Sequence, residues 1–477
     1  MVFSSLIFIC YFLPLLLACY YALGARNAVL FVGSAIFYSW GDGQYLPVLL
    51  AMVFVNYGAA RLMERVGAGA RKLIFVSILS LDVLNLCFYK YADFFIKQLN
   101  AAASWDLPSP EVTLPLGISF FTFQLVSYMV DVYGRRVRVE DSFISFATYI
   151  MMYPHLIAGP IVRFAEIADE LKSRTIRLDM AGLGVQYFIV GLCQKVLIAN
   201  TVAPLADGVF AAGPEAISML SAWLGVLAYT LQIYFDFCGY SNMAIGLAFM
   251  LGFHFPRNFN YPYSSRSITE FWRRWHISLS SWFRDYVYIP LGGSRGGKLA
   301  TLRNLLIVFF LTGLWHGAAW TFMAWGMFHG LFLVIERIGL GKLLAKMPAV
   351  VSHAYTLVVV MVGWVFFRAD DFTQAAVIIK AMFGFAQGEP VMPLVTVLTP
   401  EVLAALAIGC LFSFPLLARL LDLAGRPRIS AHESYRGPNA DTLDVHVMPV
   451  PVLLVGFVFC LAILATNTLN PFLYFRF

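Results

Sequence analysis

The chain has 477 residues, of which 60% are hydrophobic and 13% charged, and its mean hydropathy is +0.76. Soluble globular domains average about 25% charged residues, so this composition excludes a water-soluble protein and predicts a chain that crosses a membrane several times. The net charge of +6 lies mostly in loops, where it first indicates orientation in the membrane and only then a ligand. No nucleic-acid partner is expected.

Apolar runs of about 20 residues are long enough to span the hydrocarbon core of a bilayer. The first run, Leu6 to Tyr21, has no basic segment before it and no clean cleavage site after it, so we expect a retained span and not a signal peptide. Two further apolar pieces, 143–162 and 239–255, contain Pro or Gly and are expected to be broken segments that are buried or line a cavity. In chain order the expected spans are 5–23, 27–40, 44–62, 72–90, 114–133, 183–203, 218–238, 304–319, 320–337, 349–367, 400–420 and 448–467.

Lys and Arg gather in alternate loops. With these spans all the basic loops fall on one side of the membrane, which is expected to be the cytoplasmic side. Both chain termini are then expected on the periplasmic or exterior side. The basic loops are 61–72, 134–138, 163–177, 257–303 and 419–436.

The seven cysteines lie in apolar stretches, and none forms a CxxC pair. Buried single thiols behave as small hydrophobic side chains. We therefore expect free thiols, with no disulfide framework and no metal site. No bound cofactor is expected either.

The longest basic loop contains the amphipathic stretch SITEFWRRWHISLSSWFRDYVYIP. Ser267 followed by Glu270 is a capping-box pattern, which predicts that a helix begins near Ile268. Its aromatic residues recur at helical spacing, so we expect one helix at the cytoplasmic interface with the aromatic rings inward and the arginines toward water.

The arginines of this loop have two interpretations. They can simply anchor an interfacial helix, or they can hold the phosphates of a soluble cytoplasmic donor, because Arg forms paired hydrogen bonds to phosphate oxygens. The expected donor site comprises Arg273, Arg274 and Trp275. The following LGGSRGGK is not a phosphate-binding P-loop, since its spacing differs and no Ser or Thr follows the Lys.

The run RNFNYPYSSRSITEFWRRWHISLSSWFRDYVYIPLGG, followed by GLWHGAAW, resembles the membrane-bound O-acyltransferase family. Within it the chain is similar to the alginate O-acetyltransferase branch, which modifies bacterial exopolysaccharides. LPLGISFFTFQLVSYMVDVY, PHLIAGPIVR, LQIYFDFCGYSNMAIG, GWVFFRA and the terminal NPFLYFRF extend the resemblance over nearly the whole chain. Cys238 and Tyr153 depart from the branch, in which Ser and Phe are expected.

This resemblance implies an all-α polytopic fold, a ring of about 11–12 tilted transmembrane helices with re-entrant segments around a central tunnel. The whole chain, 1–477, would form one integral-membrane domain. Its successive parts would be N-terminal spans (1–135), central spans (136–255), the catalytic loop and histidine helix (256–337) and C-terminal spans (338–477).

The resemblance also places the family's signature histidine at His316 and a second histidine at His276. Ionisable residues inside a membrane are functional candidates, and a neutral imidazole can accept a proton near pH 7. His316 is therefore expected to act as a general base or as a transient acyl acceptor, two roles that the sequence leaves open. The alternative is a buried histidine bonded to a backbone carbonyl. Trp315 and Gly317 are expected to line the substrate path.

Other buried polar residues are expected to be structural. His329 has no role implied by the resemblance and is expected to hydrogen-bond across helices. Asp236, a lone carboxylate in an apolar run, is expected to have a buried partner.

The resemblance implies transfer of acetyl groups from cytoplasmic acetyl-CoA across a bacterial inner membrane to a periplasmic exopolysaccharide. Alginate is the default acceptor and cellulose a second one. The expected partners are membrane lipids, a periplasmic SGNH-type acetyltransferase and a polysaccharide biosynthesis complex. Two rival interpretations are a transporter that carries acetyl groups or polysaccharide without chemistry, and a scaffold within a polymer-export complex.

Overall fold

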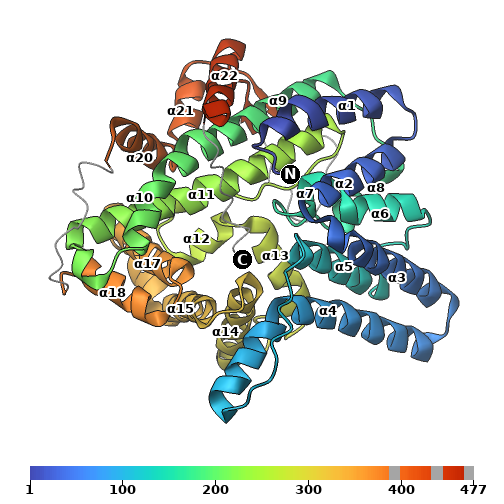
Figure 1. Cartoon of the computed structure of the whole chain (residues 1–477), viewed down its shortest axis with the longest axis horizontal. Helices are drawn as coiled ribbons and strands as arrows, with labels where there is room; N and C mark the ends of the chain where they lie inside the picture. Colours follow the sequence, from blue (N-terminus) through green and yellow to red (C-terminus); the bar gives the residue numbers. More distant parts are fainter. Residues whose placement is uncertain (386–397, 431–443, 467–477) are drawn as a thin grey trace. The chain divides into compact units, whose positions relative to one another are not determined.

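The computed structural model describes residues 1–385, 398–430 and 444–466 (Figure 1). The described regular structure is helical, apart from strands β1 (Arg428–Ser430) and β2 (Asp444–His446), which pair with each other. A helix satisfies its backbone hydrogen bonds within one segment, which is what an apolar span requires. The prediction of an all-α polytopic membrane protein is confirmed. The terminal motif NPFLYFRF lies outside the described residues.

The chain forms two compact units, of which unit 1 is Met1–Phe188, Ser241–Pro256 and Ile429–Val445, and unit 2 is Ile189–Tyr240, Arg257–Arg428 and His446–Phe477. The four successive segments expected from the sequence stay a prediction. Unit 1 contains η1 (Phe8–Phe12), α1 (Leu13–Ala22), α2 (Arg26–Asp42), η2 (Gly43–Tyr45), α3 (Leu46–Arg65), α4 (Ala68–Ala103), α5 (Ile118–Tyr133), α6 (Phe143–Met151), α7 (Tyr153–Leu156) and α8 (Phe164–Lys172).

Unit 2 holds the helices that carry His316 and His329, and two long helices, α9 (Leu178–Cys193) and α11 (Met219–Met250), contribute residues to both units. The other elements of unit 2 are η3 (Gln194–Ala199), α10 (Asn200–Phe210), η4 (Pro214–Ala216), η5 (Pro262–Ser264), α12 (Ile268–Arg274), α13 (Ile277–Phe283), η6 (Arg284–Tyr288), α14 (Gly297–His316), α15 (Trp320–Ile335), η7 (Glu336–Leu340), α16 (Gly341–Leu344), α17 (Ala349–Arg368), α18 (Phe372–Met382), α20 (Pro400–Phe412), α21 (Leu416–Leu423) and α22 (Val450–Thr466).

Each of the twelve expected spans overlaps at least one helix within the described residues. Among the described residues, five helical segments have the length and hydropathy of a complete span, and α20 with α21 forms a sixth that is bent by 70°. The expected break in 143–162 is confirmed, because α6 ends at Met151 and α7 is a single turn. The ring arrangement and the central tunnel stay predictions. The five segments are Arg26–Arg65, Ala68–Ala103, Leu178–Phe210, Gly297–His316 and Ala349–Arg368.

The expected break in 239–255 is wrong over 239–250, which continues α11 without interruption. The glycines there allow close helix packing, as small residues commonly do in membrane proteins. A Cβ atom on Gly239 would overlap the carbonyl oxygen of Gly191, and one on Gly246 would overlap that of Gly184. These glycines therefore mark contacts with α9 rather than a change of chain direction.

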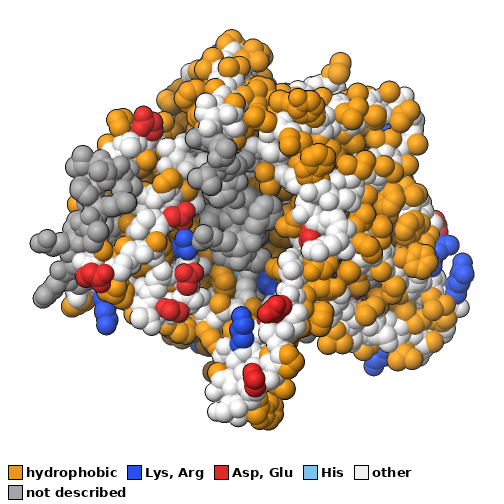
Figure 2. Space-filling view, in the orientation of Figure 1, with side chains coloured by type: hydrophobic (Ala, Val, Ile, Leu, Met, Phe, Trp, Pro, Cys, Tyr) orange, Lys and Arg blue, Asp and Glu red, His pale blue; other side chains and the backbone are white. Residues whose placement is uncertain are grey.

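Helix α4 shows how the hydrophobic composition is distributed. Ile78, Asp82 and Leu86 recur every four residues and are buried, whereas Leu73 and Leu84 are 68% and 65% exposed. Large apolar side chains that face outward along a whole helix are typical of a lipid-facing surface. Figure 2 shows such side chains over much of the visible face, with charged groups confined to small areas.

Helices α14 and α15 pack against each other through glycines, and Figure 1 shows them side by side. A Cβ atom on Gly313 would overlap the carbonyl oxygen of Phe322, and a Cβ on Gly326 would overlap that of Phe309. This close approach sets the position of His316 at the end of α14 relative to the aromatic side chains of α15.

Replacing Gly326 by alanine is expected to lower the free energy of unfolding by about 1–3 kcal/mol, because the new methyl group must push two backbones apart. Gly339→Ala is the matched control, since its Cβ would meet no atom within 4 Å. The measurement is the melting temperature of the full chain in detergent. Equal melting temperatures for the two variants would contradict the proposed close packing.

Candidate active site

The loop that carries FWRRWH folds as two short helices, not as the single interfacial helix expected from the sequence. Helix α12 begins at Ile268 as predicted, and the Ser267 side chain caps it by accepting a hydrogen bond from the Glu270 backbone N–H at 3.0 Å. The helix ends at Arg274, and His276 adopts a left-handed backbone (φ +43°) before α13 begins. Backbone hydrogen bonds from an upstream segment flank this break, since the N–H of Asn260 donates to the Arg274 carbonyl and the N–H of Ile277 donates to the Asn258 carbonyl, both at 2.9 Å.

His276 is fully buried at this break. Its ring contacts the rings of Phe237, at 4.6 Å between centroids, and Trp315, at 6.2 Å. Its Nδ1 lies 3.1 Å from Oδ1 of Asn258. Burial lowers the pKa of the His276 imidazole to about 3, because the surrounding rings solvate the cation poorly. The side chain is therefore neutral at physiological pH.

His316 is the last residue of α14 and is only 6% exposed. Its ring lies 5.0 Å from that of Trp325 and 5.0 Å from that of Phe367, both in edge-on geometry. Gly317, predicted to line the substrate path, ends the helix in an extended conformation, and a Cβ there would overlap the ring of Phe322. The structure thus places Gly317 against a packed side chain.

Trp315 joins the two candidate catalytic histidines. Its ring centroid is 4.9 Å from that of His316 and 6.2 Å from that of His276. It comes from the end of α14, whereas His276 comes from the loop 39 residues earlier. The fold of unit 2 therefore brings both histidines to one buried aromatic residue.

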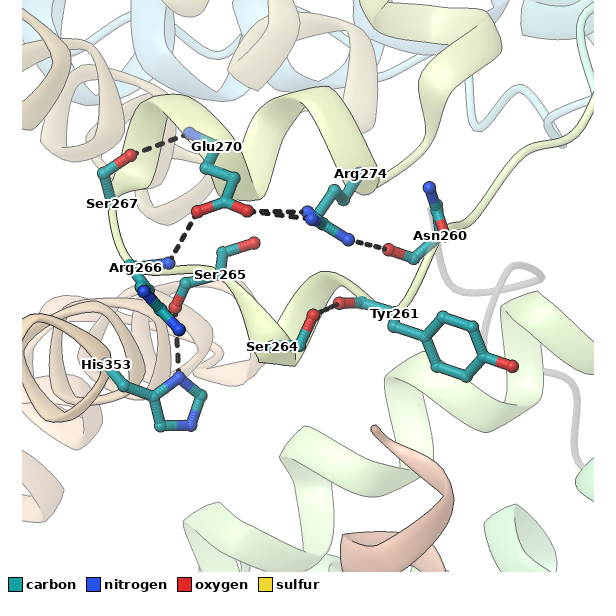
Figure 3. Close-up of polar contacts among 9 residues, drawn as sticks. All are labelled: Asn260, Tyr261, Ser264, Ser265, Arg266, Ser267, Glu270, Arg274 and His353. Carbon is teal, nitrogen blue, oxygen red and sulfur yellow. Dashed lines mark hydrogen bonds and ion pairs between the residues drawn. The ribbon is translucent and has the colours of Figure 1, made fainter. Parts of the chain in front are cut away.

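The two adjacent arginines of the expected donor site have different environments. Arg274 is engaged within its own loop, where Nε donates to Glu270 Oε1 at 3.0 Å and Nη1 donates to the Asn260 carbonyl at 3.1 Å (Figure 3). Arg273 is exposed and has no hydrogen-bond or ion-pair partner within the described residues. Arg273 is thus the cation available to a ligand.

Trp275, the third residue of the expected donor site, is 3% exposed. Its ring stacks on Phe271, at 5.6 Å between centroids, and lies 4.9 Å from Trp364. These contacts are those of a core side chain, so Trp275 supports the loop from within unit 2.

His329 belongs to the same aromatic cluster, a placement that the sequence interpretation missed. It is fully buried, and its ring lies 5.4 Å from Trp325, which also contacts His316. The expected hydrogen bond across helices is not present, because neither ring nitrogen has a partner among the described residues. The spacing of four between Trp325 and His329, which places both on one helix face, is the signal that points to this contact.

The prediction of a buried partner for Asp236 is confirmed. Asp236 forms an ion pair with Lys195 of η3, and both side chains are almost fully buried within unit 2. A buried charge that is paired in this way has a structural role. The candidate site is therefore the aromatic cluster around His316.

Comparison with known proteins points to one family. Residues 76–367 match the profile of the membrane-bound O-acyltransferase family, and this range includes His276 and His316. The chain is 40% identical to a probable alginate O-acetylase of Azotobacter vinelandii, in an alignment 505 positions long that covers all of both chains. It is 44% identical to a probable alginate O-acetylase of Pseudomonas aeruginosa, covering 81% of this chain and 75% of the relative. It is also 35% identical to a peptidoglycan O-acetyltransferase of Helicobacter pylori, covering 80% of each.

Proposed function

Because the chain belongs to the membrane-bound O-acyltransferase family, as its motifs predicted, we propose that it is a polysaccharide O-acetyltransferase. The names of the relatives, alginate O-acetylase and peptidoglycan O-acetyltransferase, both describe acetyl transfer to oxygen. The structural observation that carries the proposal is the pair of buried histidines, His276 and His316, which contact the same tryptophan within the region that matches the family.

The proposed chemistry is transfer of acetyl from the thioester of acetyl-CoA to a hydroxyl group. In one route the hydroxyl oxygen attacks the carbonyl carbon and the C–S bond breaks. The hydroxyl proton passes to His316 and then to the departing sulfur, which leaves as the CoA thiol. In the other route a nitrogen of His316 attacks the carbonyl carbon, the C–S bond breaks, and the departing sulfur takes the imidazole proton and leaves as the CoA thiol. The hydroxyl oxygen then attacks the acetyl carbon, the C–N bond breaks, and the hydroxyl proton returns to the imidazole. Both routes use the same buried imidazole.

The donor is proposed to reach the site from the cytoplasmic side, where the basic loops lie in the orientation that the charges favour. Arg273 is exposed and without a partner among the described residues, so its guanidinium can bind a phosphate oxygen of acetyl-CoA. Arg274 is held by Glu270 and supports the loop.

Arg273→Gln is expected to raise the KM for acetyl-CoA by about 10-fold, since one charge-assisted hydrogen bond contributes about 1.5–3 kcal/mol. Its melting temperature should match that of the wild type. Arg274→Gln is expected to show the opposite pattern, a lower melting temperature with a nearly unchanged KM. The two variants are measured side by side in purified full-length protein, and a raised KM confined to Arg274→Gln would contradict the assignment.

The acceptor is proposed to be an exopolysaccharide on the periplasmic side of a bacterial inner membrane. Acetyl-CoA is cytoplasmic, so acetyl groups must cross this membrane to reach such a polymer. Alginate is favoured over cellulose, since relatives named alginate O-acetylase align with the chain over its full length. A periplasmic SGNH-type acetyltransferase is proposed to complete the transfer within a polymer biosynthesis complex.

The experiment that tests the proposal is the release of CoA thiol from acetyl-CoA by the purified full-length chain in lipid nanodiscs, with the periplasmic SGNH-type acetyltransferase and soluble sugar polymer both present. An acetyltransferase releases thiol in proportion to the acetyl ester formed. A transporter or a scaffold releases no thiol. Acetyl-CoA that stays intact in the presence of correctly folded protein would therefore remove the proposed function.

A further inference from the structure

Asn258 makes the hydrogen bond that orients the ring of His276. Its Oδ1 lies 3.1 Å from Nδ1 of His276, 2.9 Å from Oγ of Ser278 and 3.3 Å from the backbone N of Ser278. Its backbone is fixed as well, because its carbonyl accepts from the N–H of Ile277 at 2.9 Å. Asn258 and His276 are both buried, at 1% and 0% exposure.

The backbone N–H of Ser278 determines which atom of the Asn258 amide faces this group. A backbone N–H can only donate, so the amide atom that it meets must be the oxygen and not the NH₂ group. The same oxygen faces Nδ1 of His276, and an oxygen acceptor at 3.1 Å requires a proton on that nitrogen. Ser278 Oγ lies farther from Nδ1, at 3.5 Å, and is already within 2.9 Å of the Asn258 oxygen.

A neutral imidazole carries one ring proton, so a proton on Nδ1 leaves a lone pair on Nε2. Nε2 of His276 is buried and has no hydrogen-bond partner among the described residues. The rings of Phe237, Phe259 and Trp315 lie around the imidazole, at centroid distances of 4.6, 6.4 and 6.2 Å. A buried acceptor without a donor costs about 1–3 kcal/mol, so the site is built to receive a donor from outside the chain.

We infer that Asn258 is a positioning residue, which holds His276 with its proton on Nδ1 so that Nε2 accepts a hydrogen bond from a hydroxyl or amide group of the substrate. The inference rests on the proposed function for the identity of the substrate, but the protonation of the ring can be measured without it. It assigns His276 the role of orienting a donor such as the acceptor hydroxyl. It excludes His276 as the group that donates to the oxyanion of the reacting carbonyl.

The test is ¹⁵N NMR of the full-length protein, labelled at histidine, in lipid nanodiscs between pH 6 and 8. Protonated and unprotonated ring nitrogens have well-separated ¹⁵N shifts, and the signals of His276 are identified by their loss in His276→Asn, a residue that tolerates the left-handed backbone. The expected wild-type result is a protonated Nδ1 and an unprotonated Nε2. A protonated Nε2, alone or in an imidazolium, would overturn the inference.

Three variants connect this protonation state to activity. Asn258→Ala is expected to lose the preference for the Nδ1 proton and to reduce thiol release by about 10²-fold, the lower range of a positioned acid–base group. Asn258→Asp keeps an oxygen acceptor and is expected to restore the Nδ1 proton and most of the activity. Ser278→Ala removes another donor to the same oxygen. It is expected to keep the Nδ1 proton of His276 and the rate of thiol release near wild type.

The outcomes separate this inference from the proposed function. A wild-type protein with the expected ring protonation and no acetyl transfer would remove the function while supporting the orientation of His276 by Asn258. An Asn258→Ala protein that folds and keeps the Nδ1 proton would overturn the inference. So would an Asn258→Asp protein that folds but does not restore the Nδ1 proton.

Discussion

Acetyl transfer by His316→Ala is expected to fall by a factor of about 10²–10⁴, the range that one positioned acid–base or nucleophilic group contributes. The residue is buried among Trp315, Trp325 and Phe367, whose rings carry no group that can accept a proton in its place. The measurement is polymer-bound acetyl ester in cells and thiol release by purified protein, both per folded molecule. His316→Gln, which leaves less of a cavity, should show the same loss.

His155→Asn is the control for burial of a histidine. His155 is fully buried in unit 1, and its Nε2 donates to the Tyr149 carbonyl at 2.7 Å, so its role is explained by a backbone hydrogen bond. Its replacement is expected to lower the melting temperature while activity per folded molecule stays near wild type. Acetylation retained in both His316 variants at normal protein levels would remove the catalytic assignment.

Lys195→Met is expected to destabilise the protein by about 3–5 kcal/mol, because it leaves the Asp236 carboxylate buried without its cation. Both side chains are 3% exposed, so water cannot replace the lost partner. The free energy of unfolding is measured by SDS titration in mixed micelles. Asp236→Asn should lose stability for the same reason, with Lys195 then left as the buried charge.

The double variant Lys195→Met/Asp236→Leu distinguishes a paired charge from two independent contributions. Removing both charges abolishes the desolvation cost together with the attraction, so the double variant is expected to be more stable than either single variant. If the loss of unfolding free energy in the double variant equalled the sum of the losses in the two single variants, the two residues would contribute separately. Because the pair lies outside the aromatic cluster, acetyl transfer per folded molecule should change little.

In the loop around His276, local sequence patterns predict where the first helix begins but not where it ends. The Ser267 cap predicted the first residue of α12, since a capping box depends on residues three apart. The same aromatic periodicity predicted one helix through His276, and the structure has two. The break is flanked by two backbone hydrogen bonds, one between Asn260 and Arg274, 14 residues apart, and one between Asn258 and Ile277, 19 residues apart. Such contacts cannot be predicted from the helical periodicity of the loop.

In the expected donor site, too, some contacts follow from the local sequence and others require the folded loop. Arg273 and Arg274 look alike in the sequence, although the spacing of four between Glu270 and Arg274 already favours an ion pair. The second contact of Arg274, with the Asn260 carbonyl, requires the folded loop. Trp275 follows them directly, but the extended backbone at the end of α12 directs its ring into the core.

The sequence by itself determined that this is a helical membrane protein, because a chain that is 60% hydrophobic cannot cover itself with polar groups, and it located the spans and His316. The tertiary structure decided which residues meet. It brought His276 and His316 to Trp315, paired Asp236 with Lys195, and placed Asn258 against His276. Those pairs are set by packing and hydrogen bonds between segments far apart in the chain, whereas the spans are set by the hydropathy of consecutive residues.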